Sequence, residues 1–465
     1  CIRDRDYIMV VQHNMQAANA NRMLNVTTSA QSKSTEKLSS GYRINRAADD
    51  AAGLTISEKM RKQIRGLDQA STNAQDGVSS VQTAEGALTE VHSMLQRMNE
   101  LATQSANGTN SNTDRKAIQD EIDQLTTEID RVSETTKFNE TYLLKGDGAE
   151  KAHNVNAHDA GLDGVTLTDK GDTVDVTLKT LNAGDKVSIA GKNYTIGATA
   201  ADAQKIVDAQ EVDGKTVTVN GTTYTYKINQ WTNADGSAAG SITIKGGDVV
   251  SDGTKTLTAM KDGADTAGAD GIDDNDSTVI TAGKAYQLQT AEIVKASSIG
   301  TDTAAAVKNG ANADKDATAT FTLNKGTVSY KDALSFNLHV GADADMTNKI
   351  TVNIDSMNSA GLGVKGIKAD TEQDATYAID AIADAISTVS SQRSSLGAVQ
   401  NRLEHTINNL DNVVENTTSA ESRIRDTDMA EEMVNYSKNN ILAQAGQSML
   451  AQANQSNQGV LSLLQ

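Results

Sequence analysis

Apolar residues recur at alternating steps of three and four along several long stretches of this chain, and these stretches lie near both ends. The first runs from Met60 to Ala102, and at 1.5 Å per residue it predicts a helix about 60 Å long. The stripe between those two residues consists of Ile64, Leu67, Ala74, Val78, Val81, Ala84, Leu88, Val91, Leu95 and Met98. Because so narrow a stripe must be covered by other apolar surface, we expect this helix to pack against further helices.

Two further stretches carry the same spacing. Ser111 with Asp114, and Thr371 with Asp374, form candidate helix caps ahead of them. The second stripe is Ile118, Ile122, Leu125, Ile129 and Val132, and the third is Ile379, Ile382, Ile386, Val389, Leu396, Val399, Leu403, Ile407, Leu410 and Val414. A period of about 3.5 residues favours a left-handed bundle. The predicted fold is therefore mainly α: a discontinuous long-helix coiled-coil bundle formed by both chain ends, over residues 51–149 plus 346–420.

The outermost segments, residues 9–50 plus 421–465, keep helical spacing more weakly. They are rich in Ala, Asn, Gln and Ser and poor in aromatics, so an isolated copy would bury too little surface to offset the entropy of ordering. We expect them to be disordered in a free monomer and helical once neighbouring copies cover them. The residues expected on their packing faces are Ala17, Ala20, Leu24, Ile441, Ala445, Met449, Ala453, Val460, Leu461, Leu463 and Leu464.

Residues 150–345 differ in composition from both ends. Arginine is absent between Arg131 and Arg393, and Gly, Asp, Thr, Ala and Val dominate. Alternation of apolar and polar residues replaces the helical spacing, and Asn220 with Gly221 between two alternating runs is a strong hairpin signal. A short helix capped by Thr199 interrupts the strands. We predict an inserted β-rich region that is exposed at the surface and tolerant of change.

Composition restricts the partners of this chain. Its formal net charge of −19 argues against nucleic acid or an anionic membrane. No run of about eighteen apolar residues is present, which argues against membrane insertion. Cys1 is the single cysteine, so no disulfide can form within the chain. Residues 1–8 lack the features of a cleaved secretory signal, and we expect them to derive from a start codon assigned too far upstream, with Met9 as the native first residue.

Sequence signals for enzyme or cofactor chemistry are weak. Gly361, Gly363 and Gly366 form a GxGxxG motif, but the next helix begins only near Thr371 and no strand with an acidic residue follows. We interpret this motif as a flexible domain junction. The acidic turn at 270–276 does not match the ligand order of a calcium loop, and HExxH does not occur. We therefore predict no enzyme activity, no cofactor and no metal site.

Two motifs carry a family resemblance. The run from Leu38 to Asn45, continued by Asp49 to Ile56, and the closing run from Asn439 to Leu464 resemble the signatures of bacterial flagellin. The resemblance leaves 150–345 unmatched. It implies a homopolymeric subunit of the extracellular flagellar filament, which serves motility. It further implies export in an unfolded state by the flagellar type III apparatus, without a cleaved signal, and contacts with an export chaperone, junction proteins and the flagellar cap.

The resemblance also implies recognition by Toll-like receptor 5 on host cells. The matching receptor-contact patch is Gln96, Arg97, Glu100 and Leu101 on the long helix with Glu121 on the next. Asn99 and Thr103 depart from the residues usual in flagellins here, which bears on the strength of recognition. Without the resemblance, the same charges would be interpreted as an ordinary solvated helix face. Two other functions stay open: a hook-filament junction protein, and a filament subunit that carries a glycan-binding insert.

Overall fold

The computed structural model describes residues 14–262 and 270–463, and side chains up to residue 455. Residues 1–8, the expected upstream segment, lie outside the described residues. The chain divides into two compact units. The first contains the chain up to Val78, Asn337–Ile350 and the chain from Asn401 onward, and the second contains Ser79–Phe336 and Thr351–Gln400. Two of these boundaries fall inside the long helices α2 (Ala51–Ser105) and α6 (Glu372–Arg425), and the other two fall inside short strands. The predicted domain bounds follow composition instead, and they stay a prediction.

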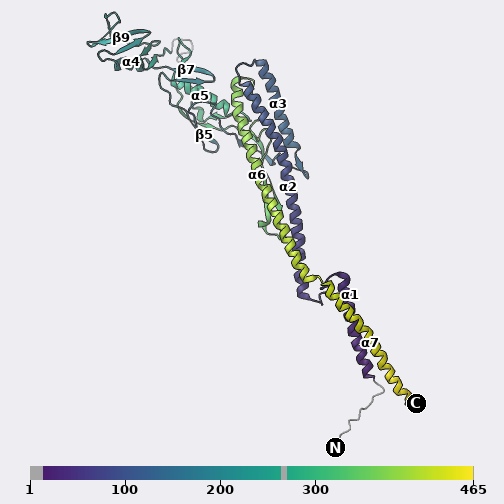
Figure 1. The fold of residues 1–465 in the computed structure, drawn as a ribbon. Coiled ribbons are helices and arrows are strands. Elements are labelled where there is room, and N and C mark those ends of the chain that lie inside the picture. The colour runs from purple at the N-terminus through teal and green to yellow at the C-terminus, as the bar shows by residue number, and fades with distance from the viewer. Residues whose placement is uncertain (1–13, 263–269, 464–465) are drawn as a thin grey trace. The chain divides into compact units, whose positions relative to one another are not determined.

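The helices of the second unit pack together through their buried apolar stripes. In it α2 and α6 run alongside α3 (Asn112–Thr135), as Figure 1 shows. The buried positions include every predicted stripe residue from Val81 to Ala102 in α2, Ile118, Ile122 and Ile129 in α3, and Ile382, Val389 and Leu396 in α6. A guanidinium–carboxylate pair also joins α6 to α2, with Arg393 Nη2 2.7 Å from Glu85 Oε1. The predicted mainly α fold, with helices from both chain ends packed together, is confirmed.

Both predicted helix caps are present. The Asp114 N–H donates to Ser111 Oγ at 3.2 Å, and the Ser111 N–H donates to Asp114 Oδ2 at 3.1 Å, which makes a reciprocal capping box for α3. At the start of α6, the Asp374 N–H donates to Thr371 Oγ1 at 3.0 Å. These bonds satisfy amides that lack a partner within the first turn of each helix.

The segment that leads into α6 is packed, so the expected flexible junction is not found there. Val364, Ile367 and Ala369 are buried. The Gln119 side chain of α3 donates from Nε2 to the Ile367 carbonyl at 2.9 Å and accepts the Ala369 N–H at 2.5 Å. A Cβ at Gly361 would lie 2.2 Å from the Ser356 carbonyl oxygen, so this close approach requires glycine. Gly361 therefore serves close packing, whereas Gly363 and Gly366 have open space around them and adopt positive φ angles of 72° and 63°, which favour glycine.

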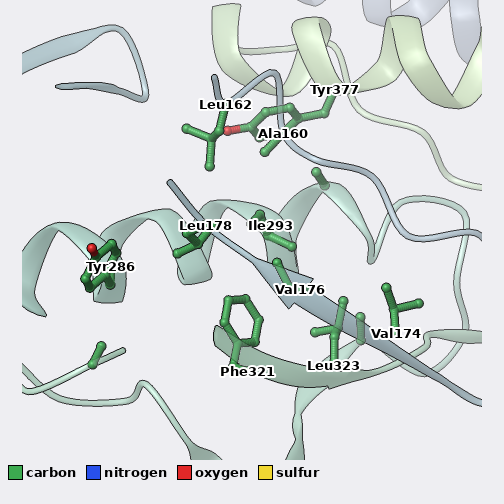
Figure 2. Close-up of a cluster of buried hydrophobic side chains, with 13 residues drawn as sticks. Ala160, Leu162, Val174, Val176, Leu178, Tyr286, Ile293, Phe321, Leu323 and Tyr377 are labelled. Atoms are coloured by element: carbon green, nitrogen blue, oxygen red, sulfur yellow. The ribbon is translucent and has the colours of Figure 1, made fainter. Parts of the chain in front are cut away.

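One half of the insert surrounds a sheet with the order β15-β16-β5-β4. Its strands are β4 (Thr166–Asp169), β5 (Thr173–Thr177), β15 (Ala306–Val307) and β16 (Thr320–Asn324). Val174, Val176 and Leu323 project from it toward α5 (Ala282–Ala296), which contributes Tyr286 and Ile293. Figure 2 shows that Tyr377 of α6 reaches the same cluster beside Ala160 and Leu162. The insert therefore shares a hydrophobic core with the helical bundle.

The other half surrounds a six-stranded antiparallel sheet with the order β11-β10-β9-β8-β12-β13, in which β12 returns to pair with β8. Its strands are β8 (Thr216–Val219), β9 (Thr222–Lys227), β10 (Gln230–Thr232), β11 (Ala238–Gly240), β12 (Val249–Ser251) and β13 (Thr256–Thr258). Trp231 is buried there with Val217, Val250 and residues of α4 (Ala200–Ala209). The predicted hairpin joins β8 to β9, and Asn220 and Gly221 both have positive φ, as a type I′ turn requires. The predicted cap of α4 is also present, since Thr199 accepts the Asp202 N–H.

The remaining strands form small sheets. A three-stranded sheet has the order β14-β7-β6, and three two-stranded sheets pair β1 with β2, β17 with β3 and β18 with β19. Their bounds are β1 (Lys137–Phe138), β2 (Thr141–Tyr142), β3 (Asp147–Asn154), β6 (Lys186–Ile189), β7 (Lys192–Ile196), β14 (Val279–Ile280), β17 (Thr327–Asp332), β18 (Leu334–His339) and β19 (Lys349–Ile354); two 3₁₀ turns occupy Lys308–Gly310 and Met346–Asn348. The insert is thus β-rich, as predicted, but α5 is a long helix that sequence reasoning missed.

Truncation of one stripe residue should measure how much the bundle depends on burial. Leu95 of α2 is fully buried, so Leu95→Ala should lower the free energy of unfolding of the full chain by about 3 kcal/mol in urea titrations. Ser93→Ala, an exposed site on the same helix, should change it by less than about 0.5 kcal/mol. Equal effects of the two substitutions would show that the stripe does not carry the stability.

Candidate functional surfaces

The two terminal helices form an antiparallel pair within the first unit. They are α1 (Met15–Ser40) and α7 (Met429–Leu463), which lie side by side in Figure 1. At one end of the pair, Asn14 Nδ2 donates to the Ala453 carbonyl at 3.0 Å, and at the other, Lys37 Nζ lies 3.6 Å from Glu432 Oε2. Small residues permit this approach, since a Cβ at Gly446 would lie 3.3 Å from Leu24 Cδ1. Segments from opposite ends of the sequence therefore meet directly.

Little of this pair is buried. Among the described side chains of the two helices, the buried ones are Ser34, Glu432 and Ala443. Several large apolar side chains are exposed instead, namely Met15, Met23, Val26, Met429, Met433, Val434, Ile441, Leu442 and Met449. Single exposed apolar residues are common on monomeric proteins, but a series along one helix pair marks an interaction surface.

The predicted packing residues of these helices fall into two groups. Ala17, Ala20, Leu24 and Ala453 are half-buried within the pair. Ile441, Ala445 and Met449 point away from α1, with Ile441 66% and Met449 64% exposed. The side chains of Val460, Leu461 and Leu463 and the whole of Leu464 lie outside the described residues. The structure therefore assigns the three α7 residues to the outer face, where another molecule can reach them.

Polar contacts join the segment that follows α1 to the segment that precedes α7, at one end of the terminal pair. The Arg43 N–H donates to the Arg425 carbonyl at 2.6 Å, and the Thr427 N–H donates to the Gly41 carbonyl at 3.0 Å. The Arg425 guanidinium lies 4.8 Å from the centre of the Tyr42 ring and pairs with Glu58 at 2.7 Å. The predicted motif around Tyr42 thus has a structural role, which its sequence alone did not show.

The predicted receptor-contact patch is a charged surface that spans α2 and α3 of the second unit. Arg97 Nη2 lies 2.9 Å from Glu121 Oε1, and Arg97 Nη1 lies 3.2 Å from Glu100 Oε2. The hydrogen bond to Glu121, followed by that to Glu100, raises the pKa of Arg97 above its ordinary value. Gln96 is exposed and contacts His92, with their Nε2 atoms 3.1 Å apart. Leu101 is 2% exposed, so its side chain supports the patch from within the bundle.

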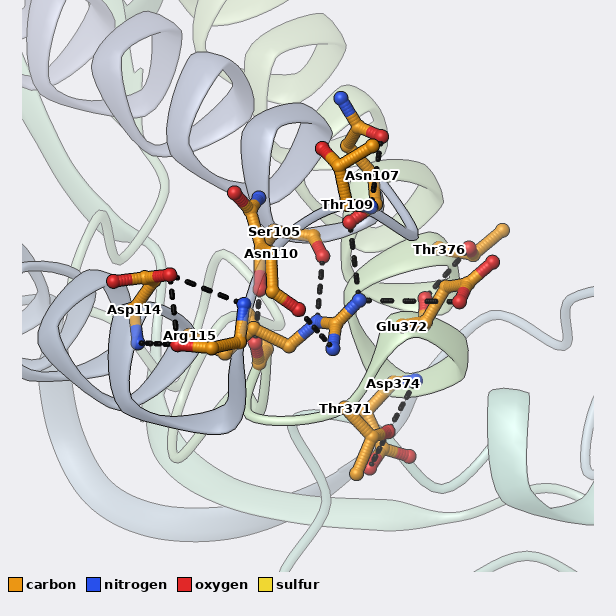
Figure 3. A network of polar contacts seen from close by, with 12 residues as sticks. Ser105, Asn107, Thr109, Asn110, Asp114, Arg115, Thr371, Glu372, Asp374 and Thr376 are labelled. Carbon is orange, nitrogen blue, oxygen red and sulfur yellow. Dashed lines mark hydrogen bonds and ion pairs between the residues drawn. The ribbon is translucent and has the colours of Figure 1, made fainter.

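A buried arginine fixes the register between α2 and α3, and with it the geometry of the charged patch. Arg115 donates from Nε to the Ser105 carbonyl at 2.9 Å, from Nη1 to that of Asn110 at 3.1 Å, and from Nη2 to that of Asn107 at 3.1 Å. Its Nη2 also lies 3.8 Å from Glu372 Oε2 at the start of α6 (Figure 3). One side chain therefore closes the end of α2 and ties all three helices together.

A second buried network joins α5 of the insert to α6. The Tyr377 hydroxyl donates to Glu292 Oε2 at 2.6 Å, and Lys295 Nζ lies 3.0 Å from Glu292 Oε1. Burial, followed by the bond to Glu292, raises the pKa of Tyr377 well above its ordinary value, so the phenol stays a donor at neutral pH. This network rigidifies the junction between insert and bundle.

The described residues offer little for other kinds of site. None of the described helices is long and apolar enough to cross a membrane. Across 14–262 and 270–463, no group of three or more His, Cys, Asp or Glu side chains is arranged to hold a metal ion. The fold is therefore that of a self-associating subunit. Long helices from both chain ends form it, and the α1–α7 pair exposes an apolar face that is suited to association with other chains.

Comparisons with known proteins identify the family. The family model of the bacterial flagellin N-terminal helical region matches residues 11–149, and that of the C-terminal helical region matches residues 379–464. A flagellin from Clostridium tyrobutyricum is 43% identical over 456 residues, which cover 97% of this chain and 100% of the relative. Flagellin C from Vibrio cholerae is 35% identical over 458 residues, with 98% and 99% covered. The chain belongs to the flagellin family, whose members are structural subunits of the extracellular bacterial flagellar filament.

A solved structure adds little to this identification. FliC from Burkholderia pseudomallei is 18% identical, with 70% of this chain and 99% of that chain covered and a TM-score of 0.28. A score this low carries no argument, so the family rests on the sequence relatives and on the family models.

Loss of the buried arginine should loosen the α2–α3 turn. Arg115→Met should lower the free energy of unfolding by about 2–4 kcal/mol, because one buried and two half-buried bonds from the guanidinium to carbonyl groups are lost. Arg131→Met removes an exposed pair with Glu128 on α3 and should lower the free energy of unfolding much less, because solvent screens such a pair. Urea titration of both variants measures the difference. A cost below that of Arg131→Met would contradict the assigned role of Arg115.

Proposed function

We propose that this chain polymerises into the flagellar filament through the outer face of its α1–α7 pair. Membership of the flagellin family supports filament formation in general. The observation that carries the specific proposal is the exposure of Ile441, Ala445 and Met449 on a helix whose inner face already packs on α1. Burial of such side chains by neighbouring copies stabilises each contact by about 1.5–3 kcal/mol per large apolar side chain.

We further propose that the chain is exported unfolded through the flagellar type III apparatus, with an export chaperone in the cell and the flagellar cap and junction proteins outside it. The sparse burial of the α1–α7 pair supports this proposal, because little packing must be broken before transit. The sequence contains no proline and no internal cysteine, so refolding outside the cell requires neither proline isomerisation nor disulfide formation. Such a subunit would need no cleaved signal.

Substitution on the outer face of α7 should block elongation. Ile441→Asp should slow growth from filament seeds at least about tenfold, because the new charge would be buried without a partner. Ile441→Val keeps the face apolar and should elongate seeds at nearly the native rate. Light scattering of seeded solutions measures both rates.

The same assay separates polymerisation from the two alternatives. Native chain that fails to extend seeds would favour the junction-protein function. If Ile441→Asp elongated seeds as fast as the native chain, the proposed role of this face would be wrong. Unfolding curves of both variants must overlay that of the native chain, so that loss of elongation reports on the surface rather than on the fold.

We also propose that Toll-like receptor 5 recognises the patch formed by Gln96, Arg97, Glu100 and Glu121. The family supports this, and the geometry is consistent with it. The four side chains are exposed on two adjacent helices, and Arg97 is held between its two carboxylate partners. Arginine at the centre of such a surface is well suited to dominate a protein contact.

Substitution of two exposed arginines, one inside the patch and one outside it, tests the receptor proposal. Arg97→Ala should weaken receptor binding about tenfold in surface plasmon resonance, because it removes the centre of the patch. Arg131→Ala removes an exposed, carboxylate-paired arginine of α3 outside the patch and should leave binding unchanged. Equal affinities of the two variants would refute the assignment of the patch.

A further inference from the structure

A polar cleft lies within the second unit, where the insert meets the start of α6. It has a volume of about 1120 Å³. Lys186, Val187 and Ser188 of β6 line one wall, Gln289 of α5 lies in another, and the first turn of α6 forms a third. A cavity of this size is large enough for a ligand of several residues.

The β6 wall of this cleft is the free edge of a sheet. The sheet order is β14-β7-β6, so β6 has a neighbour on one side only. The Asp185 carbonyl accepts the Ile196 N–H at 2.8 Å, which directs Asp185 toward β7. In an antiparallel pair such residues alternate, so Lys186 and Ser188 direct their N–H and C=O groups to the open side. No described group outside the sheet bonds to them.

An unpartnered buried side chain faces the same cleft. Gln289 is 3% exposed, and its Oε1 atom has no hydrogen-bond partner among the described residues. Its buried neighbour Glu292 is bonded to Tyr377, Gln373 and Lys295, so polar groups here are otherwise satisfied. A buried acceptor without a partner is rare and calls for a donor that the structure does not supply. Lys186 also has no carboxylate within ion-pair distance among the described residues.

We propose that this cleft binds an extended peptide segment of a partner protein as an added strand on β6. The peptide main chain would bond to the free groups of Lys186 and Ser188, and a donor on the peptide would reach Gln289 Oε1. A saccharide fits less well, because the Tyr377 ring is buried in the hydrophobic cluster and offers no free face for stacking. This binding is independent of polymerisation.

The probe is a phage-displayed library of random linear peptides, selected on the full-length chain. Enriched peptides are then measured by fluorescence polarisation against variants. Gln289→Ala should weaken binding about tenfold. Gln287→Ala is the matched control: it lies on the same helix and also has an unpartnered Oε1, but it does not line the cleft, and binding should not change.

The backbone contacts are tested in two ways. Ser188→Pro removes an N–H that faces away from β7, so it should abolish peptide binding while the β6–β7 pairing and the circular dichroism spectrum are kept. Should that variant misfold, N-methylation along the peptide gives an independent test on the native chain, and binding should be lost at every second position. Absence of enriched peptides, or of that alternation, would overturn the proposal. Saccharide-array binding that depends on Gln289 but not on Ser188 would also overturn it.

Discussion

The structure depends on the burial of apolar stripes that no single helix can cover. In α2, α3 and α6 most stripe residues are buried and the others are half-buried. The whole insert separates α6 in sequence from α2 and α3. The bundle is therefore complete only when the chain returns, after the insert, to pack α6 against α2 and α3. Gln119 bonds to the segment before α6, and Arg115 pairs with Glu372 at the start of α6. These contacts fix the register of α6 against α3.

The terminal pair also carries apolar side chains that other apolar surface must cover. It does not cover them within one molecule. Its inner face is formed by small and polar side chains around Leu24, Ala443 and Gly446, whereas Ile441 and Met449 are left outside. A bundle that buries its stripes is stable alone, whereas a pair that leaves them exposed gains stability from neighbours. On the proposal that the terminal helices order during assembly, this difference accounts for a stable bundle and assembly-dependent ends within one chain.

Much of this arrangement could be predicted from the sequence, because periodicity and caps are local signals. The stripes, the caps at Ser111 and Thr371 and the Asn220–Gly221 turn were all predicted correctly. The outward direction of Ile441 was not predictable, since both faces of α7 carry apolar residues and only the partner helix decides which faces inward. The role of Arg115 depends on carbonyl groups that become neighbours only after folding. The free edge of β6 and the unpartnered Oε1 atom of Gln289 likewise could not be predicted from neighbouring residues in the sequence.

We propose that the α1–α7 pair becomes stably ordered when other copies cover its outer face. Hydrogen–deuterium exchange of the full-length chain, compared between monomer and filament, tests this claim most directly. We expect fast exchange of α1 and α7 amides in the monomer, strong protection of the same amides in the filament, and protection of the central α2 amides in both. Equal protection of α1 and α7 in monomer and filament would contradict it.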